Sequence, residues 1–175
     1  MDGSQIQERL ELSREELLLA IESLPDEALL EPGAAGDWSV RDVLGHLTNW
    51  EAELVTALLR LKRGQKPDHL LAAMSDRDAY NAGRATEVQQ RDLDQVFTDF
   101  QNVRIQLEEW LVEFGDRDLS NPARYPALAG RPLWQVIAEN SFEHEAEHTA
   151  DLAAFAALWE AEQTGRDVIW LSTGV

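Results

Sequence analysis

The sequence contains no cysteine. This absence excludes disulfide bonds, thiolate metal ligands and a cysteine nucleophile, and it is what we expect of a protein in the reducing cytoplasm. Long apolar runs are also lacking, because no stretch approaches the roughly 20 residues that span a bilayer. The polar residues 2–5 that follow Met1 do not resemble a signal peptide. We therefore expect a cytoplasmic protein without a membrane partner.

Positive charge is scarce. The 175 residues include 15 Lys and Arg against 33 Asp and Glu, which gives a formal net charge of −18. Binding of nucleic acid depends on Lys and Arg that neutralise phosphates, so this balance excludes a nucleic-acid partner, and it also disfavours an anionic membrane surface. The length suits one domain with a real core and is too short for two typical ones. We interpret the acidity as a well-solvated surface.

No segment has the alternating pattern of a strand, whereas apolar residues recur at helical spacing in four long segments. Ser39 followed three residues later by Asp42 predicts a capping box at the start of the second helix. Four amphipathic helices in one domain predict an all-α four-helix bundle over residues 1–164. The expected helices cover residues 4–24, 39–64, 86–114 and 132–163.

A long connection separates the second and third of these helices. It spans residues 65–84 and is expected to contain a short helix over residues 70–81. The C-terminal tail, residues 165–175, includes Ile169-Trp170-Leu171 and is expected to pack as an extended segment or to cover a partner.

Two of the four histidines occur in the segment Glu143-His144-Glu145-Ala146-Glu147-His148. Side chains four residues apart lie on one face of a helix, so His144 and His148 can grip one divalent metal ion. His46 lies near the start of the second predicted helix, on or near its apolar face, and cores of helical bundles are places where facing helices build metal sites. Alternatively, His144 and His148 are surface histidines among solvated glutamates, which leaves His46 unexplained.

Two polar residues share the face of this histidine pair. Asn140 lies four residues before His144, and Asp151 lies three residues after His148. Either side chain can orient an imidazole from the second coordination shell, as hydrogen-bond partners of metal ligands commonly do. An ordinary polar contact within the bundle is an equal alternative.

Three further residues are weaker candidates. Trp50, four residues after His46, either lines a pocket or, more simply, belongs to the core. Glu143 and Glu147 are either general bases near the metal or, more commonly for glutamates, parts of a solvated face. His69, the remaining histidine, is interpreted as a surface residue.

Three segments carry a resemblance to a known family. Residues 37–51, DWSVRDVLGHLTNWE, resemble the second-helix signature of the DinB-like superfamily of helical bundles, in which a Trp-Ser pair opens the helix and a histidine follows about two turns on. Residues 133–148 resemble the last-helix motif of the same superfamily. Tyr80-Asn81-Ala82 and the helix expected after it are similar to the ClbS/DfsB branch. The resemblance covers nearly the whole chain.

This resemblance implies a metal site and a range of activities. It implies that His46, His144 and His148 form the superfamily's metal triad, which usually holds zinc or nickel. Relatives include thiol-dependent isomerases and transferases, and a resistance protein that opens a cyclopropane ring in a genotoxin. Some members of the ClbS/DfsB branch lack the triad, whereas this chain keeps all three positions. The implied function is a hydrolase or a thiol-dependent S-transferase or isomerase that acts on a small molecule, in detoxification.

Two other classes of function stay open. If the protein is an enzyme that uses a thiol, the thiol must come from a low-molecular-weight cosubstrate, because the chain has no cysteine. The first alternative to an enzyme is a non-catalytic bundle that binds or sequesters a small molecule. The second alternative is a structural dimerisation module that uses Ile169-Trp170-Leu171 and makes the protein a homodimer.

Overall fold

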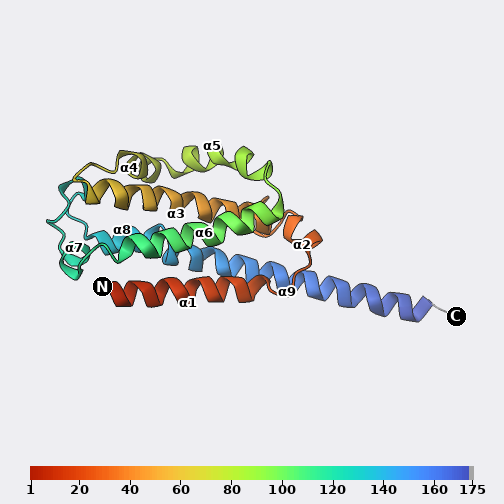
Figure 1. The fold of residues 1–175 in the computed structure, drawn as a ribbon. Helices are drawn as coiled ribbons and strands as arrows, with labels where there is room; N and C mark the ends of the chain where they lie inside the picture. Colours follow the sequence, from red (N-terminus) through yellow and green to blue (C-terminus); the bar gives the residue numbers. More distant parts are fainter. Residues whose placement is uncertain (174–175) are drawn as a thin grey trace.

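The computed structural model describes the backbone of residues 1–173 and the side chains of residues 1–164. Four long helices run alongside one another as a bundle (Figure 1): α1 (Gly3–Ile21), α3 (Val40–Lys62), α6 (Leu93–Leu111) and α9 (Phe142–Thr173). Within residues 1–173 the only β-type pairing is an isolated bridge between Ala35 and Trp38. The predicted all-α bundle is therefore confirmed.

The bundle is held together by the apolar faces of its helices. Helix α1 packs against α9, and α3 packs against α6. The inward side chains Leu10, Leu17, Leu54, Leu58 and Phe100 are fully buried. Burial of each such side chain contributes roughly 1.5–3 kcal/mol, which explains why apolar residues at helical spacing predicted these helices.

The predicted capping box opens α3. The backbone N–H of Asp42 donates to Ser39 Oγ over 3.2 Å, and the backbone N–H of Ser39 donates to Asp42 Oδ2 over 3.1 Å. These reciprocal bonds satisfy two donors that a helix N-terminus leaves free. They set where α3 begins.

The third predicted helix, residues 86–114, is wrong as a single element. The chain instead forms α5 (Arg77–Gln89) and then α6, separated by Asp92 in extended conformation, with φ −70° and ψ 165°. Asp92 accepts a hydrogen bond of 2.8 Å from the backbone N–H of Gln95, so it acts as the N-cap of α6. The helix expected at residues 70–81 is divided between α4 (Asp68–Ser75) and the start of α5.

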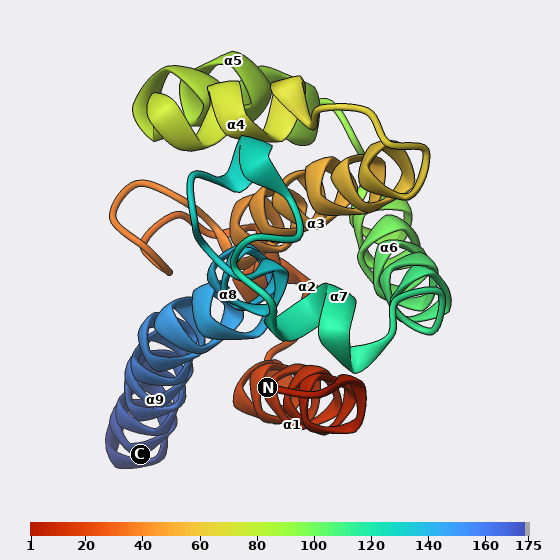
Figure 2. The same ribbon diagram turned by 90° about the vertical axis from the view of Figure 1, so that its left-hand side faces the viewer.

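Helices α4 and α5 cover α3 on the side away from α1 (Figure 2). The approach of α5 to α3 depends on Gly45. A Cβ atom at this position would lie 2.3 Å from Cγ1 of Val88, far inside van der Waals contact. Only glycine therefore permits this spacing between the two helices.

The fourth predicted helix, residues 132–163, is interrupted. It consists of α8 (Leu133–Glu139) and α9, with a break at Asn140 and Ser141. The side chains of Asn140 and Ser141 donate to the carbonyl oxygens of Val136 and Ile137, over 2.7 and 2.6 Å. In a continuous helix these two carbonyls would instead accept from the backbone N–H groups of Asn140 and Ser141. Competition of this kind is typical of Asn and Ser inside helices.

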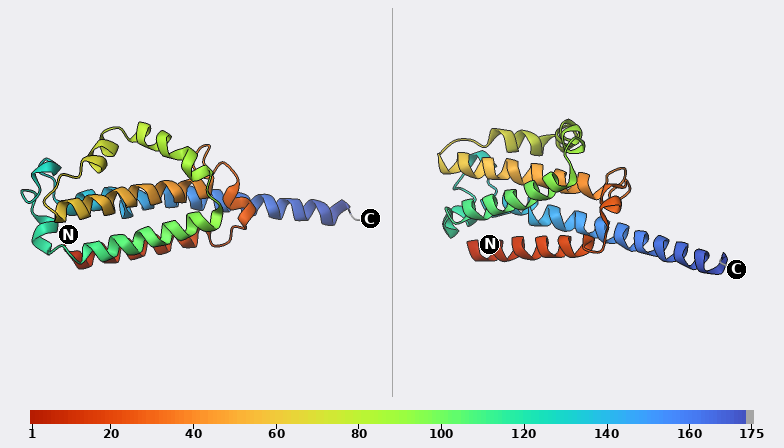
Figure 3. Two further views of the ribbon diagram at one scale, coloured as in Figure 1. Left: turned by 45° about the horizontal axis from the view of Figure 1, so that its top comes forward. Right: turned by 45° about the vertical axis from the view of Figure 1, so that its right-hand side comes forward.

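Helix α9 runs beyond the ends of the other helices (Figure 3). The backbone of residues 165–173 is helical, so the extended tail expected there is wrong. The side chains of Ile169, Trp170 and Leu171, on which the expected dimer contact depends, lie outside the described residues, as do residues 174–175.

Short elements complete the chain. The first helix ends at Ile21, not at residue 24, and is followed by α2 (Asp26–Leu30). Helix α7 (Asp116–Ser120) and a 3-10 turn, η1 (Pro126–Leu128), connect α6 to α8. None of the helices within the described part of the chain is both long and apolar enough to cross a lipid bilayer.

Candidate metal centre

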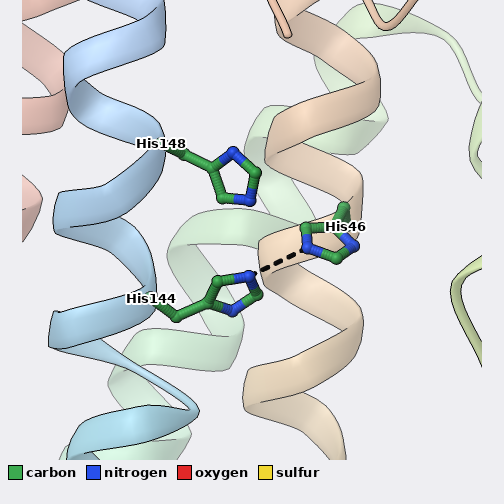
Figure 4. Close-up of side chains that lie close together, drawn as sticks. All are labelled: His46, His144 and His148. Carbon is green, nitrogen blue, oxygen red and sulfur yellow. Dashed lines mark hydrogen bonds between the residues drawn. The ribbon is translucent and has the colours of Figure 1, made fainter. Parts of the chain in front are cut away.

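Three histidines converge between α3 and α9 (Figure 4). His46 comes from α3, and His144 and His148 lie one turn apart on α9. One ring nitrogen from each lies within 4.8 Å of the other two. The Nε2 atoms of His46 and His144 are 2.9 Å apart, and the ring centroids are separated by 4.8 to 5.2 Å. The structure thus brings together the three residues that the sequence singled out.

The protonation state of the cluster suits a metal ion. His46 and His144 are 8 % and 7 % exposed, and His148 is half-buried. Burial, the neighbouring imidazoles and the charge of Arg77 lower the pKa of His46 to about 3. Burial, His148 and Arg77 likewise lower the pKa of His144 to about 3. Burial also lowers the pKa of His148, although the charge of Asp151 opposes the shift. All three imidazoles are therefore neutral at neutral pH, which is the form that ligates metals.

The arrangement of donors also fits a divalent ion. Two of the rings carry buried nitrogens, Nδ1 of His144 and Nδ1 of His148, that have no hydrogen-bond partner among the described residues. Three neutral imidazoles that lie this close together form a nitrogen donor set of the kind that zinc and nickel accept. The cluster can hold a divalent metal ion, and three protein ligands leave further coordination positions open.

The structure shows contacts for the two expected second-shell residues. The Asn140 amide donates to Val136 O over 2.7 Å and to Met74 Sδ over 3.6 Å, while its Oδ1 is buried without a partner among the described residues. Asp151 is exposed and acts on His148 through its charge. No hydrogen bond joins either residue to an imidazole in the described part of the chain, so their second-shell role stays a prediction.

Trp50 separates the histidine cluster from α5. It is 1 % exposed and belongs to the buried core. Its indole N–H donates to Asn81 Oδ1 over 3.0 Å, and its ring lies 4.8 Å from the ring of Tyr80 and 6.1 Å from that of His144. The structure thus gives Trp50 the position of a core tryptophan beside the site.

A pocket opens next to His46, between α3 and α5. The cavity volume is about 20 Å³, room for roughly one water molecule and far below the range for small-molecule sites. The ring of Trp38 lies 4.9 Å from that of His46 and forms part of the wall. Other residues that line it are Asn49, Tyr80, Asn81, Arg84 and Val88. A water-sized group in this pocket would contact His46, at one edge of the histidine cluster.

A buried ion network lies beside the site, and the sequence did not predict it. Glu51 and Glu145 are 2 % and 1 % exposed, and Arg104 bonds to both, at 2.9 Å to Glu145. Arg14 donates from Nε to Glu145 over 2.6 Å and lies 3.3 Å from Glu51. Ser13 Oγ donates to Glu145 over 2.5 Å. The alternative of surface histidines among solvated glutamates therefore does not hold for Glu145, whereas Glu143 and Glu147 are exposed.

This network joins all four long helices. Arg14 belongs to α1, Glu51 to α3, Arg104 to α6 and Glu145 to α9. Burial acts to raise the pKa of Glu145, but the two arginines and Ser13 outweigh it and the pKa is lowered. Because Glu145 follows His144 directly, these bonds also fix how α9 is rotated toward α3. A signal was present in the sequence, since both arginines stand at apolar positions of their helices.

The remaining histidine is placed as predicted. His69 lies on α4 and is exposed. It does not belong to the three-histidine cluster.

The three-histidine cluster and the all-α bundle that carries it agree with a family assignment. A model of the DinB superfamily matches residues 9–152. The chain belongs to the DinB superfamily. The crystal structure of an uncharacterised protein from Escherichia coli UTI89 is similar to this DinB superfamily chain, with a TM-score of 0.76 over 91 % of this chain and 95 % of that one. At 13 % identity this similarity concerns the fold alone. No curated protein matches.

Proposed function

We propose that this DinB superfamily protein is a metal-dependent enzyme that acts on a small molecule, as a hydrolase or as a thiol-dependent S-transferase or isomerase with a role in detoxification. The observation that carries the proposal is the convergence of three neutral imidazoles next to a pocket. The ClbS/DfsB branch and a low-molecular-weight thiol cosubstrate belong to the same proposal.

In this proposal His46, His144 and His148 hold zinc or nickel. When bound, such an ion supplies Lewis acidity, which makes water or a thiol a nucleophile at neutral pH. The chain's own residues shape the surroundings. Trp38 and Trp50 pack around the imidazoles and limit access of water. The network around Glu145 holds α9 in the rotation that directs His144 toward His46.

Tyr80 offers a neutral hydroxyl at the pocket wall. Burial, followed by the charge of Glu53, raises the pKa of Tyr80 to about 12. The hydroxyl lies 3.2 Å from Asn49 O and 3.4 Å from Glu53 Oε1, so it is a donor already occupied by the protein. We therefore assign Tyr80 to the wall of the pocket and not to proton transfer.

A second candidate function is a non-catalytic protein that binds or sequesters a small molecule. One observation favours it. Among the described residues the only carboxylate that lines the pocket is that of Asp42, and it is bonded to Ser39 and Arg41. Glu143 and Glu147, for which a role as general bases was the less common alternative, are exposed.

Metal analysis of protein purified without an affinity tag tests the proposed centre. We expect about one equivalent of a divalent metal, with loss of tight binding in His144→Ala and in His148→Ala and unchanged helical content by circular dichroism. The matched control is His69→Ala, which removes an exposed histidine and should leave the metal content unchanged. Less than about a tenth of an equivalent, persisting after addition of zinc or nickel, or full metal in both variants, would contradict the proposal.

Expectations about partners and location remain predictions. These are a small-molecule substrate, no nucleic-acid or membrane partner, a homodimer and a cytoplasmic location.

A further inference from the structure

An open groove separates α1 from α6. Helix α1 packs most closely against α9, and α6 packs most closely against α3, so that α1 and α6 lie on neighbouring sides of the bundle (Figure 2). The groove between them has a volume of about 760 Å³, which is within the range of small-molecule sites. It extends along α1 from Glu11 to Glu22, a length of about 16 Å at roughly 1.5 Å per residue. Its size therefore suits a small organic molecule.

The floor of the groove is made by two arginines that bridge the two helices. Arg14 of α1 donates to the carbonyl oxygen of Phe100 on α6 over 2.7 Å, and Arg104 of α6 donates to the carbonyl oxygen of Leu10 on α1. Both arginines line the groove, and both are also bonded to the two buried carboxylates of the ion network. The floor therefore spans a fixed separation of the helices and carries no unmatched positive charge.

The walls of the groove are largely apolar. Leu18 and Phe97, which are half-buried, line it from α1 and α6, and Leu19 is 61 % exposed beside them. The other apolar residues that line it are Ile21, Leu24 and Leu29. Removal of such a surface from water is favourable, so the groove suits an occupant with an apolar body.

Five carboxylates line the same groove. They belong to Glu11, Glu15, Glu22, Asp26 and Glu108. None of the five has an ion-pair or hydrogen-bond partner within the part of the chain that the structure describes. Burial raises the pKa of Glu108; the charge of Arg104 opposes this shift and the charge of Glu11 adds to it. Negative charge thus accumulates around an apolar groove without a matching cation from the chain.

We propose that the groove between α1 and α6 binds a hydrophobic organic cation, a small molecule that carries an ammonium group on an apolar body. The body lies against Leu18, Leu19 and Phe97, and the ammonium group lies among the five carboxylates, whose mutual repulsion it reduces. The same carboxylates repel an organic anion. They also repel a second copy of the chain, which carries its own net charge of −18.

This site is separate from the proposed metal centre. None of the residues that line the groove belongs to the three-histidine cluster or to the pocket beside His46. Binding of the cation therefore does not depend on the proposed function.

Isothermal titration calorimetry with three probes that share a phenylbutyl body tests the proposal. The probes are trimethyl(4-phenylbutyl)ammonium, 4-phenylbutanol and 4-phenylbutanesulfonate, and the ammonium group has no lone pair with which to ligate a metal ion. We expect the ammonium probe to bind on the order of tenfold more tightly than the alcohol, and the sulfonate to bind more weakly than the alcohol. The preference for the ammonium probe should shrink in about 0.5 M salt, because salt screens the carboxylates.

A pair of double variants tests the role of charge. Glu11→Gln with Glu108→Gln should reduce the preference for ammonium over alcohol to about threefold or less, because two of the lining charges are lost. The matched control is Glu16→Gln with Glu109→Gln. These exposed glutamates lie on the same two helices but do not line the groove, so the control loses the same net charge and should keep the preference.

A pair of leucine variants tests the role of the apolar wall. Leu19→Ala should weaken binding of the ammonium and alcohol probes by a similar factor and leave the preference unchanged. The matched control is Leu12→Ala, which removes an exposed leucine of α1 outside the groove and should change neither affinity.

Three outcomes would overturn the proposal. The first is equal binding of the three probes, or no binding of the ammonium probe at millimolar concentration. The second is an equal loss of preference in the two double variants. The third is a dimer that excludes the probes and that Leu19→Ala dissociates in sedimentation, which would assign the groove to a second copy of the chain. If Glu11→Gln with Glu108→Gln fails to fold by circular dichroism, the comparison of Glu108→Gln with Glu109→Gln decides the question.

Discussion

Removal of Arg104 offers a sharp test of the buried network. Arg104 bonds to Glu51, to Glu145 and to the carbonyl oxygen of Leu10, and it is 4 % exposed. In the wild type two carboxylates face two guanidinium groups. In Arg104→Met two carboxylates face Arg14 alone, so one negative charge is left without a partner in the core.

The expected loss follows from that imbalance. Removing one partner of a buried ion pair costs about 3–5 kcal/mol, because the other charge stays buried. A domain of this size has a total stability of roughly 5–15 kcal/mol, so Arg104→Met should lose a large fraction of it. The double variant Glu51→Gln with Arg104→Met restores the charge balance, and we expect it to be more stable than Arg104→Met alone.

The measurement is urea unfolding followed by far-UV circular dichroism, at pH 7 and at pH 5. The lowered pKa of Glu145 means that its ionised form stabilises the wild type above its unfolded pKa, and that this contribution is lost as the pH falls through the folded value. Without Arg104 the burial of Glu145 raises its pKa, so the variant takes up a proton on mild acidification. The difference in stability should therefore be smaller at pH 5 than at pH 7.

Arg9→Met is the matched control, because Arg9 is exposed on α1, and its change should stay within about 0.5 kcal/mol. A loss below about 1 kcal/mol for Arg104→Met at pH 7 would refute the reasoning. So would a loss that is the same at both pH values, or a double variant no more stable than the single one.

Two further predictions concern helix packing and protonation. Gly45→Ala should destabilise the protein by about 1–3 kcal/mol, because the added methyl group overlaps Val88. Adding Val88→Ala to this variant should restore most of the lost stability. The control Gly83→Ala should not destabilise the protein, because nothing lies within 4 Å of a Cβ atom there, and thermal unfolding measures all three variants. Because the pKa of His46 is lowered, the unfolded chain binds more protons than the folded chain between about pH 6.5 and 3. The metal-free protein should therefore lose stability as the pH falls from 7 to 5. His46→Gln should weaken this dependence of stability on pH. An equal pH dependence in the variant would contradict the second prediction.

Much of the fold could be predicted from residue patterns. The long helices and the capping box at Ser39 follow from local periodicity and local hydrogen bonds, which depend on residues within a few positions of one another. The breaks before α6 and before α9 could not be predicted from the same patterns. Asp92, Asn140 and Ser141 compete with the helix through their side chains, and whether they prevail depends on what the two halves pack against.

The candidate site divides in a similar way. The spacing of His144 and His148 places them one turn apart on any helix, and the resemblance to the superfamily added His46. Nothing local indicated that Glu145 is buried while Glu143 is exposed, since both stand in the same acidic run. The presence of Arg77 on a separate helix over Trp50 is also a feature of the assembled chain.

The sequence by itself therefore determined the helices, their amphipathic faces and the pair of histidines on one of them. Only the tertiary structure decided that His46 meets this pair, that Glu145 is matched by two arginines and that Arg77 lies over Trp50. The physical reason is that helical periodicity specifies which residues share a face, whereas the packing of α1, α3, α5, α6 and α9 specifies which faces meet.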